Sequence, residues 1–119
     1  MSVHIGNRTF EAEYLEPSQF NQGMQGRKEL NGCMVFKMGK GHHSFWMKGC
    51  LIPLDIIFVN GGRISHIHPN CQPSGNQLNP PRYSGIGDHV IEFPGGTSNG
   101  WKVGDKVGMY LGSPLNPVA

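Results

Sequence analysis

Glycine and proline are spread so densely along this chain that a long helix has no room to form. The 119 residues include 18 glycines and 9 prolines. In a helix interior each glycine costs about 1 kcal/mol and each proline about 3 kcal/mol relative to alanine. Short apolar runs lie between these residues. The pattern predicts a mainly β chain with many turns and one short helix near residues 18–25, with Ser18 as its N-cap.

The apolar runs predict about seven strands. Val3 and Ile5 alternate with polar neighbours before Gly6-Asn7, and alternation resumes at Phe10, which predicts a hairpin. A nearly continuous apolar run is typical of a central strand covered on both faces, as expected for residues 54–59. The other expected segments are strands at 33–38, 44–48, 63–68, 89–93 and 106–111, a turn at 39–43, and a long loop at 69–88 that holds four prolines.

Strand number and chain length together predict one domain. About 119 residues can enclose a single hydrophobic core. Many short strands with frequent turns favour a sandwich or a barrel. We therefore expect a single β domain at residues 1–111 and a flexible tail at 112–119.

Composition argues against two classes of partner. Charged residues are 15% of the chain, the net charge is +2, and lysine and arginine never cluster, so no nucleic-acid partner is expected. The longest apolar stretch, residues 51–59, contains Pro53 and Asp55 and is too short to cross a bilayer, so no membrane partner is expected either. The first residues lack the features of a secretion signal, which predicts a cytoplasmic location.

The cysteines are Cys33, Cys50 and Cys71, and an odd number cannot pair completely within one chain. With no export signal visible, free thiols are expected and no intramolecular disulfide is predicted. Cys33 and Cys50 are interpreted as small buried core residues.

Three segments resemble one family. The longest is FWMKGCLIPLDIIFVNGGRI, and QGMQGRKELNGCMVF and HVIEFPGG with VGDKV support it in the same order. Together they are similar to the uncharacterised family domain of unknown function 192 (DUF192). The resemblance implies a jelly-roll-like β sandwich and no activity that could be transferred. Compact relatives without a signal resemble proteins of bacteriophage genomes, which implies a possible phage origin.

The chain departs from the family pattern at three positions. Gly49 replaces an asparagine, and His89 replaces an aromatic residue. Many relatives carry a second cysteine in the long loop, where this chain has Cys71 alone. The loop disulfide that the resemblance implies is therefore in doubt.

Trp46, Lys48 and Asp55 are the candidate ligand-binding residues. Trp46 and Lys48 lie two apart on a predicted strand and share a face. Asp55 interrupts an apolar run, and a buried carboxylate needs hydrogen bonds. One interpretation is a pocket in which Trp46 stacks on a ligand and the two charged groups fix it. The structural alternative, which we favour, makes Trp46 core and satisfies Asp55 through Lys48 or backbone N–H groups near residues 49–51.

His66, His68 and Cys71 form a weaker candidate metal site. Two histidines two apart share a strand face, and imidazole and thiolate both bind zinc or iron. The H-x-H pair resembles the metal motif of cupins, but the glutamate that should follow is missing. Two partly exposed histidines at a strand edge are the favoured interpretation, so no metal or other cofactor is expected.

No complete catalytic set is recognisable in the sequence, which has no Gly-x-Ser-x-Gly, Walker loop, dinucleotide fingerprint or CxxC. The function therefore stays open, with a non-catalytic binding or accessory module for an unknown small molecule or protein as the leading hypothesis. A metal-dependent cupin-like enzyme using His66 and His68 is the first alternative. A phage structural or interaction protein, located in the virion, is the second.

Overall fold

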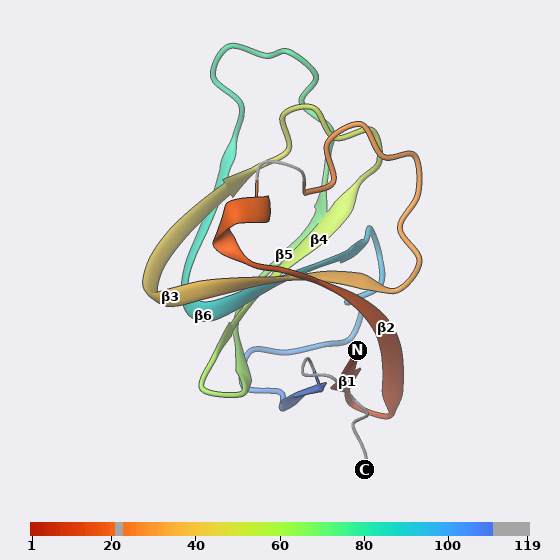
Figure 1. Cartoon of the computed structure of the whole chain (residues 1–119), viewed down its shortest axis with the longest axis vertical. Helices are drawn as coiled ribbons and strands as arrows, with labels where there is room; N and C mark the ends of the chain where they lie inside the picture. The colour runs from red at the N-terminus through yellow and green to blue at the C-terminus, as the bar shows by residue number, and fades with distance from the viewer. Residues whose placement is uncertain (21–22, 111–119) are drawn as a thin grey trace.

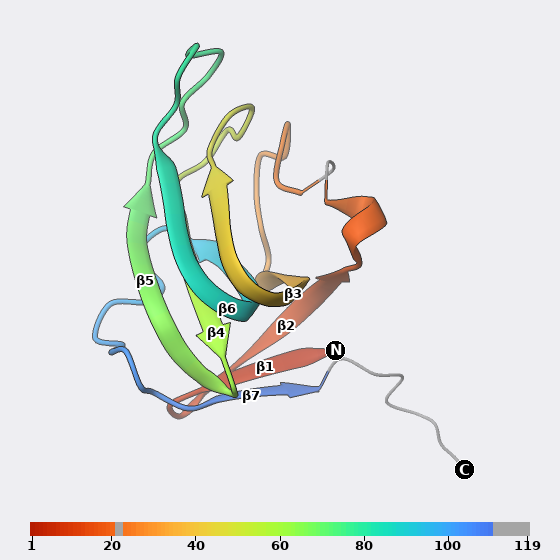
Figure 2. The ribbon, with the colours of Figure 1, turned by 90° about the vertical axis from the view of Figure 1, so that its left-hand side faces the viewer.

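The computed structural model describes residues 1–20 and 23–110, and their backbone forms one strongly curled sheet (Figure 1). Its strands are β1 (Ser2–Ile5), β2 (Arg8–Leu15), β3 (Cys33–Trp46), β4 (Leu54–Asn60), β5 (Arg63–Cys71), β6 (Arg82–Pro94) and β7 (Val107–Tyr110). They join in the order β5-β4-β6-β3-β2-β1-β7. In side view the long strands bend into a half-barrel (Figure 2). The prediction of a mainly β single domain is confirmed, and its form is barrel-like.

The N-terminal hairpin is formed as predicted. Ile5 pairs with Arg8 across the Gly6-Asn7 turn, where Gly6 has a φ of +63°. That left-handed conformation costs glycine little, because glycine has no Cβ. The predicted tail at 112–119 lies outside the described residues.

The two strands predicted at 33–38 and 44–48 are one strand, β3, so the turn predicted at 39–43 is wrong. The register against β6 shifts between Lys37 and Gly41, and pairing continues on both sides of the shift. A β-bulge of this kind bends a strand and increases its twist without ending it. Glycine and histidine therefore mark the bend of the half-barrel here.

The loop predicted at 69–88 is also shorter than expected, because β5 continues to Cys71 and β6 begins at Arg82. The glycines near the start of β6 allow close packing. A Cβ atom on Gly85 would lie 2.7 Å from the His66 ring, and one on Gly87 would lie 2.6 Å from the Val59 carbonyl oxygen. Glycine within a strand often marks such a close approach.

The predicted helix near 18–25 is, within the described residues, a single 3-10 turn, η1 (Pro17–Gln19). The Glu16 N–H donates to Oε1 of Gln19 at 3.0 Å, so the turn starts at Glu16 and Ser18 is not its N-cap. Residues 21–22 of the predicted helix lie outside the described residues. In this part of the chain, no helix has the length and apolar character needed to cross a bilayer.

Strand β4 is buried along nearly its whole length, which confirms the prediction of a central strand covered on both faces. Its side chains alternate between two clusters. The first cluster lies on the β1, β2 and β7 side of the sheet and includes Ile57 and Val59. The second lies on the concave side, beneath the segment that follows η1, and includes Leu54, Ile56 and Phe58.

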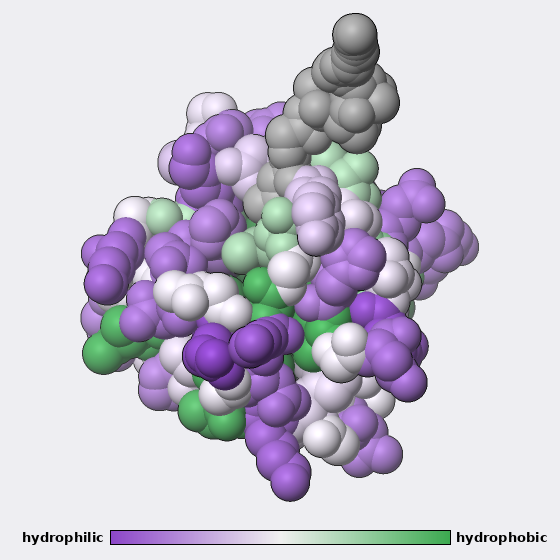
Figure 3. Space-filling view, turned by 90° about the horizontal axis from the view of Figure 1, so that it is seen from below, coloured by the Kyte–Doolittle hydropathy of each residue, from purple (hydrophilic) through white to green (hydrophobic). Residues whose placement is uncertain are grey.

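The end of the molecule near β1 and β7 is covered mainly by hydrophilic side chains, with hydrophobic ones gathered in a few small spots (Figure 3). Scattered apolar groups are normal on a soluble surface. The cavity of interest lies on the concave side of the sheet.

Candidate functional site

A cavity of about 320 Å³ lies between the concave face of β3 and β6 and the segment that follows η1. This volume is at the lower end of the range typical for small-molecule sites, about 300–1,000 Å³. Its lining is mostly apolar and aromatic, with two cations and one carboxyl group. The lining residues are Phe20, Gly23, Met24, Gln25, Phe36, Met38, Ser44, Phe45, Trp46, Lys48, Cys50, Arg82 and Glu92.

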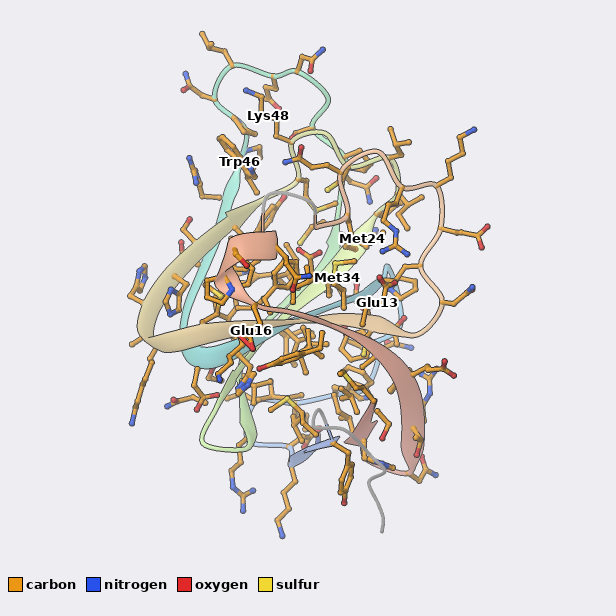
Figure 4. All side chains as sticks on the ribbon, in the orientation of Figure 1. Glu13, Glu16, Met24, Met34, Trp46 and Lys48 are labelled. Carbon is orange, nitrogen blue, oxygen red and sulfur yellow. The ribbon has the colours of Figure 1, made fainter. Side chains whose placement is uncertain are left out.

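Trp46 is at one end of the cavity with two cations beside it. The strand register places Trp46 of β3 opposite Arg82 of β6. The Arg82 guanidinium carbon lies 4.2 Å from the centre of the Trp46 ring, and Nζ of Lys48 lies 5.3 Å from it. Figure 4 shows Trp46 and Lys48 together at the end of β3. Cations so close to an indole ring gain cation–π stabilisation and stay available to an anionic group.

This arrangement partly confirms the sequence interpretation. Trp46 and Lys48 lie side by side, as predicted, although β3 ends at Trp46 and Lys48 belongs to the following turn. The expectation that Trp46 belongs to the core is wrong, because its relative exposure is 36%. Strand pairing with Arg82 holds the indole at the rim of the cavity instead.

Glu92 lines the cavity from the face of β6 that also carries Val90, although its relative exposure is only 4%. Burial raises the pKa of Glu92 to about 8. Removing a carboxylate from water disfavours its charged form unless donors replace the water. Within residues 1–20 and 23–110, no group donates a hydrogen bond to this side chain.

The segment opposite the strands is fixed to the sheet at two points. The Gly26 N–H donates to the Gly49 carbonyl at 2.9 Å. Further along, Arg27 makes a bidentate ion pair with Glu13 of β2, with N–O distances of 2.7 and 2.8 Å. Figure 4 shows buried Met24 and Met34 within the interior that this segment covers. The cavity is therefore bounded on both sides by anchored chain.

Gly49 also explains one departure from the expected family pattern. Its φ of +79° is in the left-handed region. Asparagine is one of the few non-glycine residues that adopts this region readily, so either residue suits the turn. A Cβ atom at Gly49 would lie 3.2 Å from Cγ of Gln25, so the glycine also lets the cavity wall pack closely.

Asp55 lies on the opposite face of the sheet, away from Trp46 and Lys48. Its side chain is fully buried and accepts three backbone hydrogen bonds, which confirms the predicted burial. The donors are the N–H groups of Asn70 at 2.7 Å, Gly96 at 3.0 Å and Ser98 at 2.7 Å. The predicted donors, Lys48 and residues 49–51, are wrong because the bend after β6 approaches Asp55 more closely. The structure therefore separates Asp55 from the other two candidates.

The histidine pair on β5 packs against aromatic side chains. The rings of His66 and His68 are parallel, 6.5 Å apart, and each meets Phe58 edge-on. Nε2 of His68 donates to the Ser84 carbonyl at 2.7 Å, and the Cys71 thiol donates to the His68 carbonyl at 3.3 Å. Among the described residues, no three His, Cys, Asp or Glu side chains converge as a metal-ligand group. The three predicted ligands are not brought together.

All three cysteines are free and buried. Burial raises the pKa of Cys33 to about 12 and the pKa values of Cys50 and Cys71 to about 11. Cys50 lines the cavity, whereas Cys33 lies in the core cluster on the other side of the sheet. At neutral pH each is a protonated thiol and a weak nucleophile.

Sequence reasoning missed Glu92 and Arg82. Glu92 interrupts the apolar run HVIEF as Asp55 interrupts LIPLDIIF, so the same argument could have identified it. Arg82 carried no such signal, because it was assigned to a loop. Only the pairing of β6 with the far end of β3 brings it to Trp46.

Two solved structures are similar over most of the chain. A protein of unknown function from Novosphingobium aromaticivorans DSM 12444 has 31% identity and a TM-score of 0.79, over 91% of this chain and 84% of its own. A presumed transcription regulator from Sinorhizobium meliloti 1021 has 25% identity and a TM-score of 0.76, over 90% of this chain and 89% of its own. Among proteins with curated descriptions, none matches.

The sequence pattern of one family matches nearly the whole chain. The match covers residues 1–109 and includes all seven strands except the end of β7. The family is DUF192, described as Uncharacterized ACR. The three motifs that suggested this family contribute Trp46, Lys48 and Glu92 of the cavity lining. The chain belongs to the DUF192 family.

Proposed function

We propose that the protein is a non-catalytic binding module whose ligand is a small amphipathic molecule with an anionic group. One observation carries the proposal: an apolar cavity of about 320 Å³ has Trp46, Arg82 and Lys48 at one end. The apolar walls bury the body of such a ligand, and the cations orient its anionic group. Arginine suits this role because its planar guanidinium binds a carboxylate through two parallel hydrogen bonds.

The thiol in the cavity supports binding over covalent catalysis. Cys50 lines the cavity, and burial raises its pKa to about 11. Nucleophilic cysteines depend on a lowered pKa to form a thiolate. Cys50 instead acts as a small apolar wall residue.

The test is direct binding of defined anions. Straight-chain carboxylates and ω-amino carboxylates of four to eight carbons are titrated while tryptophan fluorescence and the unfolding midpoint are recorded. At least one probe is expected to saturate, change the Trp46 emission and raise the midpoint, since binding to the native state stabilises it. Trp46→Phe should abolish the fluorescence change, because Trp101 belongs to the other core cluster.

Variants assign the anion site. Arg82→Ala is expected to weaken binding at least about tenfold, which corresponds to about 1.4 kcal/mol, the order expected for a charge-assisted hydrogen bond. Lys102→Ala is the matched control, because this cation is exposed and does not line the cavity. Equal affinities in wild type and Arg82→Ala, or no saturable binding by any probe, would overturn the proposal.

A second role, as an interaction protein such as a phage virion component with a jelly-roll fold, stays a prediction. Particle assembly is tested by sedimentation over a range of concentrations. A concentration-dependent, closed oligomer would favour it, and a monomer would favour the binding module. Nucleic acid is not part of the proposal, because the net charge is +2 and no basic cluster occurs in the sequence.

A further inference from the structure

Glu92 is the feature of the cavity that anion binding does not explain. Its side chain is almost fully buried, it faces the cavity, and no group in the described parts of the chain donates to it. Desolvating a carboxyl group without donors is costly. The cost is avoided when a ligand supplies a donor or a positive charge.

The two polar ends of the cavity differ in charge. Arg82 and Lys48 lie beside Trp46, where β6 starts, whereas Glu92 lies ten residues further along the curved strand. Apolar side chains, among them Phe36 and Phe45, line the space with them. A ligand that filled this cavity would meet cations at one end and a carboxyl group at the other.

We propose that Glu92 binds an ammonium group of the ligand, so that the cavity selects zwitterions in which a carboxylate and a primary amine are joined by an apolar segment. The inference rests on the proposed function and names its ligand class. The carboxylate pairs with Arg82 and Lys48, and the amine pairs with Glu92. A low-dielectric cavity strengthens both contacts.

Binding of this kind is linked to proton release. The titratable groups nearest Glu92 are the Cys50 and Cys71 thiols, whose pKa values burial raises to about 11, so they are neutral below pH 9. Lys48 and Arg82 are the charged groups of the same cavity. The ammonium group favours the charged form of Glu92, so binding displaces its proton. Affinity for an amino carboxylate therefore rises between pH 6 and pH 8, whereas affinity for a plain carboxylate does not.

The experiment compares three probes of equal length: 6-aminohexanoate, hexanoate and hexylamine. Affinities are measured by calorimetry on wild type and Glu92→Gln at pH 6 and pH 8. Wild type is expected to bind 6-aminohexanoate at least about tenfold more tightly than hexanoate at pH 8. Glu92→Gln should lose this preference and keep its affinity for hexanoate. Glu13→Gln is the matched control, since that carboxylate lies outside the cavity.

The outcomes separate the two proposals. If hexanoate binds wild type as tightly as 6-aminohexanoate and Arg82→Ala weakens both, the ammonium inference is overturned and the anion site stands. If neither probe nor any longer or shorter homologue binds, both are overturned. Should Glu92→Gln fail to fold, wild type alone decides, because titration in buffers of different ionisation enthalpy counts the protons released. Zero protons would overturn the inference.

Discussion

Neighbouring strands bury two carboxyl groups, and the fold treats them in opposite ways. Asp55 on β4 and Glu92 on β6 lie on opposite faces of the sheet, beside each other's strand partners: Asp55 pairs with Phe93, and Ile56 pairs with Glu92. Asp55 accepts three backbone N–H groups. Glu92 accepts none from the described residues and faces a cavity. Burial alone therefore does not mark a functional carboxyl group, whereas burial without donors beside open space does.

The donors of Asp55 come from two segments distant in sequence. Asn70 belongs to β5, and Gly96 and Ser98 belong to the bend after β6. The same bend is held by the Gly95 N–H, which donates to the Pro53 carbonyl at 3.0 Å. Asp55 thus ties three parts of the chain together and has a structural role. Its interruption of the apolar run is needed for the fold.

Removing Asp55 is the largest expected effect. Asp55→Ala leaves three backbone donors unpaired in a buried site, and we expect a loss of about 4 kcal/mol in the free energy of unfolding. Urea unfolding measures it. Asp88→Ala is the control, since Asp88 is partly exposed and accepts one backbone N–H, from Gly61. A loss below about 1 kcal/mol for Asp55→Ala would place this residue with Glu92 as a candidate for function.

Replacing Glu92 should have the opposite sign above neutral pH. Burial raises the folded-state pKa of Glu92 to about 8, against 4.5 for an unburied glutamate. Between these values the folded chain keeps a proton that the unfolded chain loses, so stability falls as pH rises. At about 1.4 kcal/mol per pKa unit, the loss attributable to Glu92 from pH 5 to pH 8 is about 3 kcal/mol.

Glu92→Gln is therefore expected to match wild type near pH 5 and to exceed its stability by about 3 kcal/mol at pH 8. Denaturant unfolding at both pH values measures the difference. Glu13→Gln serves as the control for the loss of one carboxylate from the surface. Equal pH dependence in wild type and Glu92→Gln would mean that Glu92 has a partner, and the contrast with Asp55 would disappear.

The two faces should also differ in thiol reactivity. Cys50 borders the cavity, and Cys33 is sealed in the cluster beside Asp55, with burial raising their pKa values to about 11 and about 12. We expect Cys50 to alkylate about tenfold faster at pH 8, in line with about one pKa unit and its better access. Iodoacetamide labelling followed by peptide mass spectrometry measures both rates. Equal rates would show that the cavity does not admit small molecules to Cys50.

Local patterns predicted much of the fold. Alternation and the Gly6-Asn7 turn gave the hairpin, and the apolar run gave β4 as a strand covered on both faces. The errors share one cause. Glycine-rich segments, residues 39–43 and 82–88, were interpreted as turn and loop, but they pair with each other in the bend of the half-barrel. Which glycines serve packing depends on contacts such as Gly85 with His66, and these are distant in sequence.

The candidate site was predicted in part for the same reason. Trp46 and Lys48 are local in sequence, and they do lie together. Asp55 also looked local to them, but alternation along β4 places it on the other face. Arg82 reaches Trp46 only through long-range pairing, so no local pattern could include it. Glu92 could have been found by applying the argument for Asp55 a second time.

A third carboxylate sharpens the comparison with the smallest expected effect. Glu13 has an ideal bidentate partner in Arg27, but both side chains are well exposed, at 44% and 38%. Exposed pairs contribute about 0.2–1 kcal/mol, because water screens the charges and two long side chains lose freedom. A double-mutant cycle of Glu13→Gln and Arg27→Gln should give a coupling of about 0.5 kcal/mol that weakens in high salt. A coupling above about 2 kcal/mol would show that partners outweigh burial, contrary to the contrast between Asp55 and Glu92.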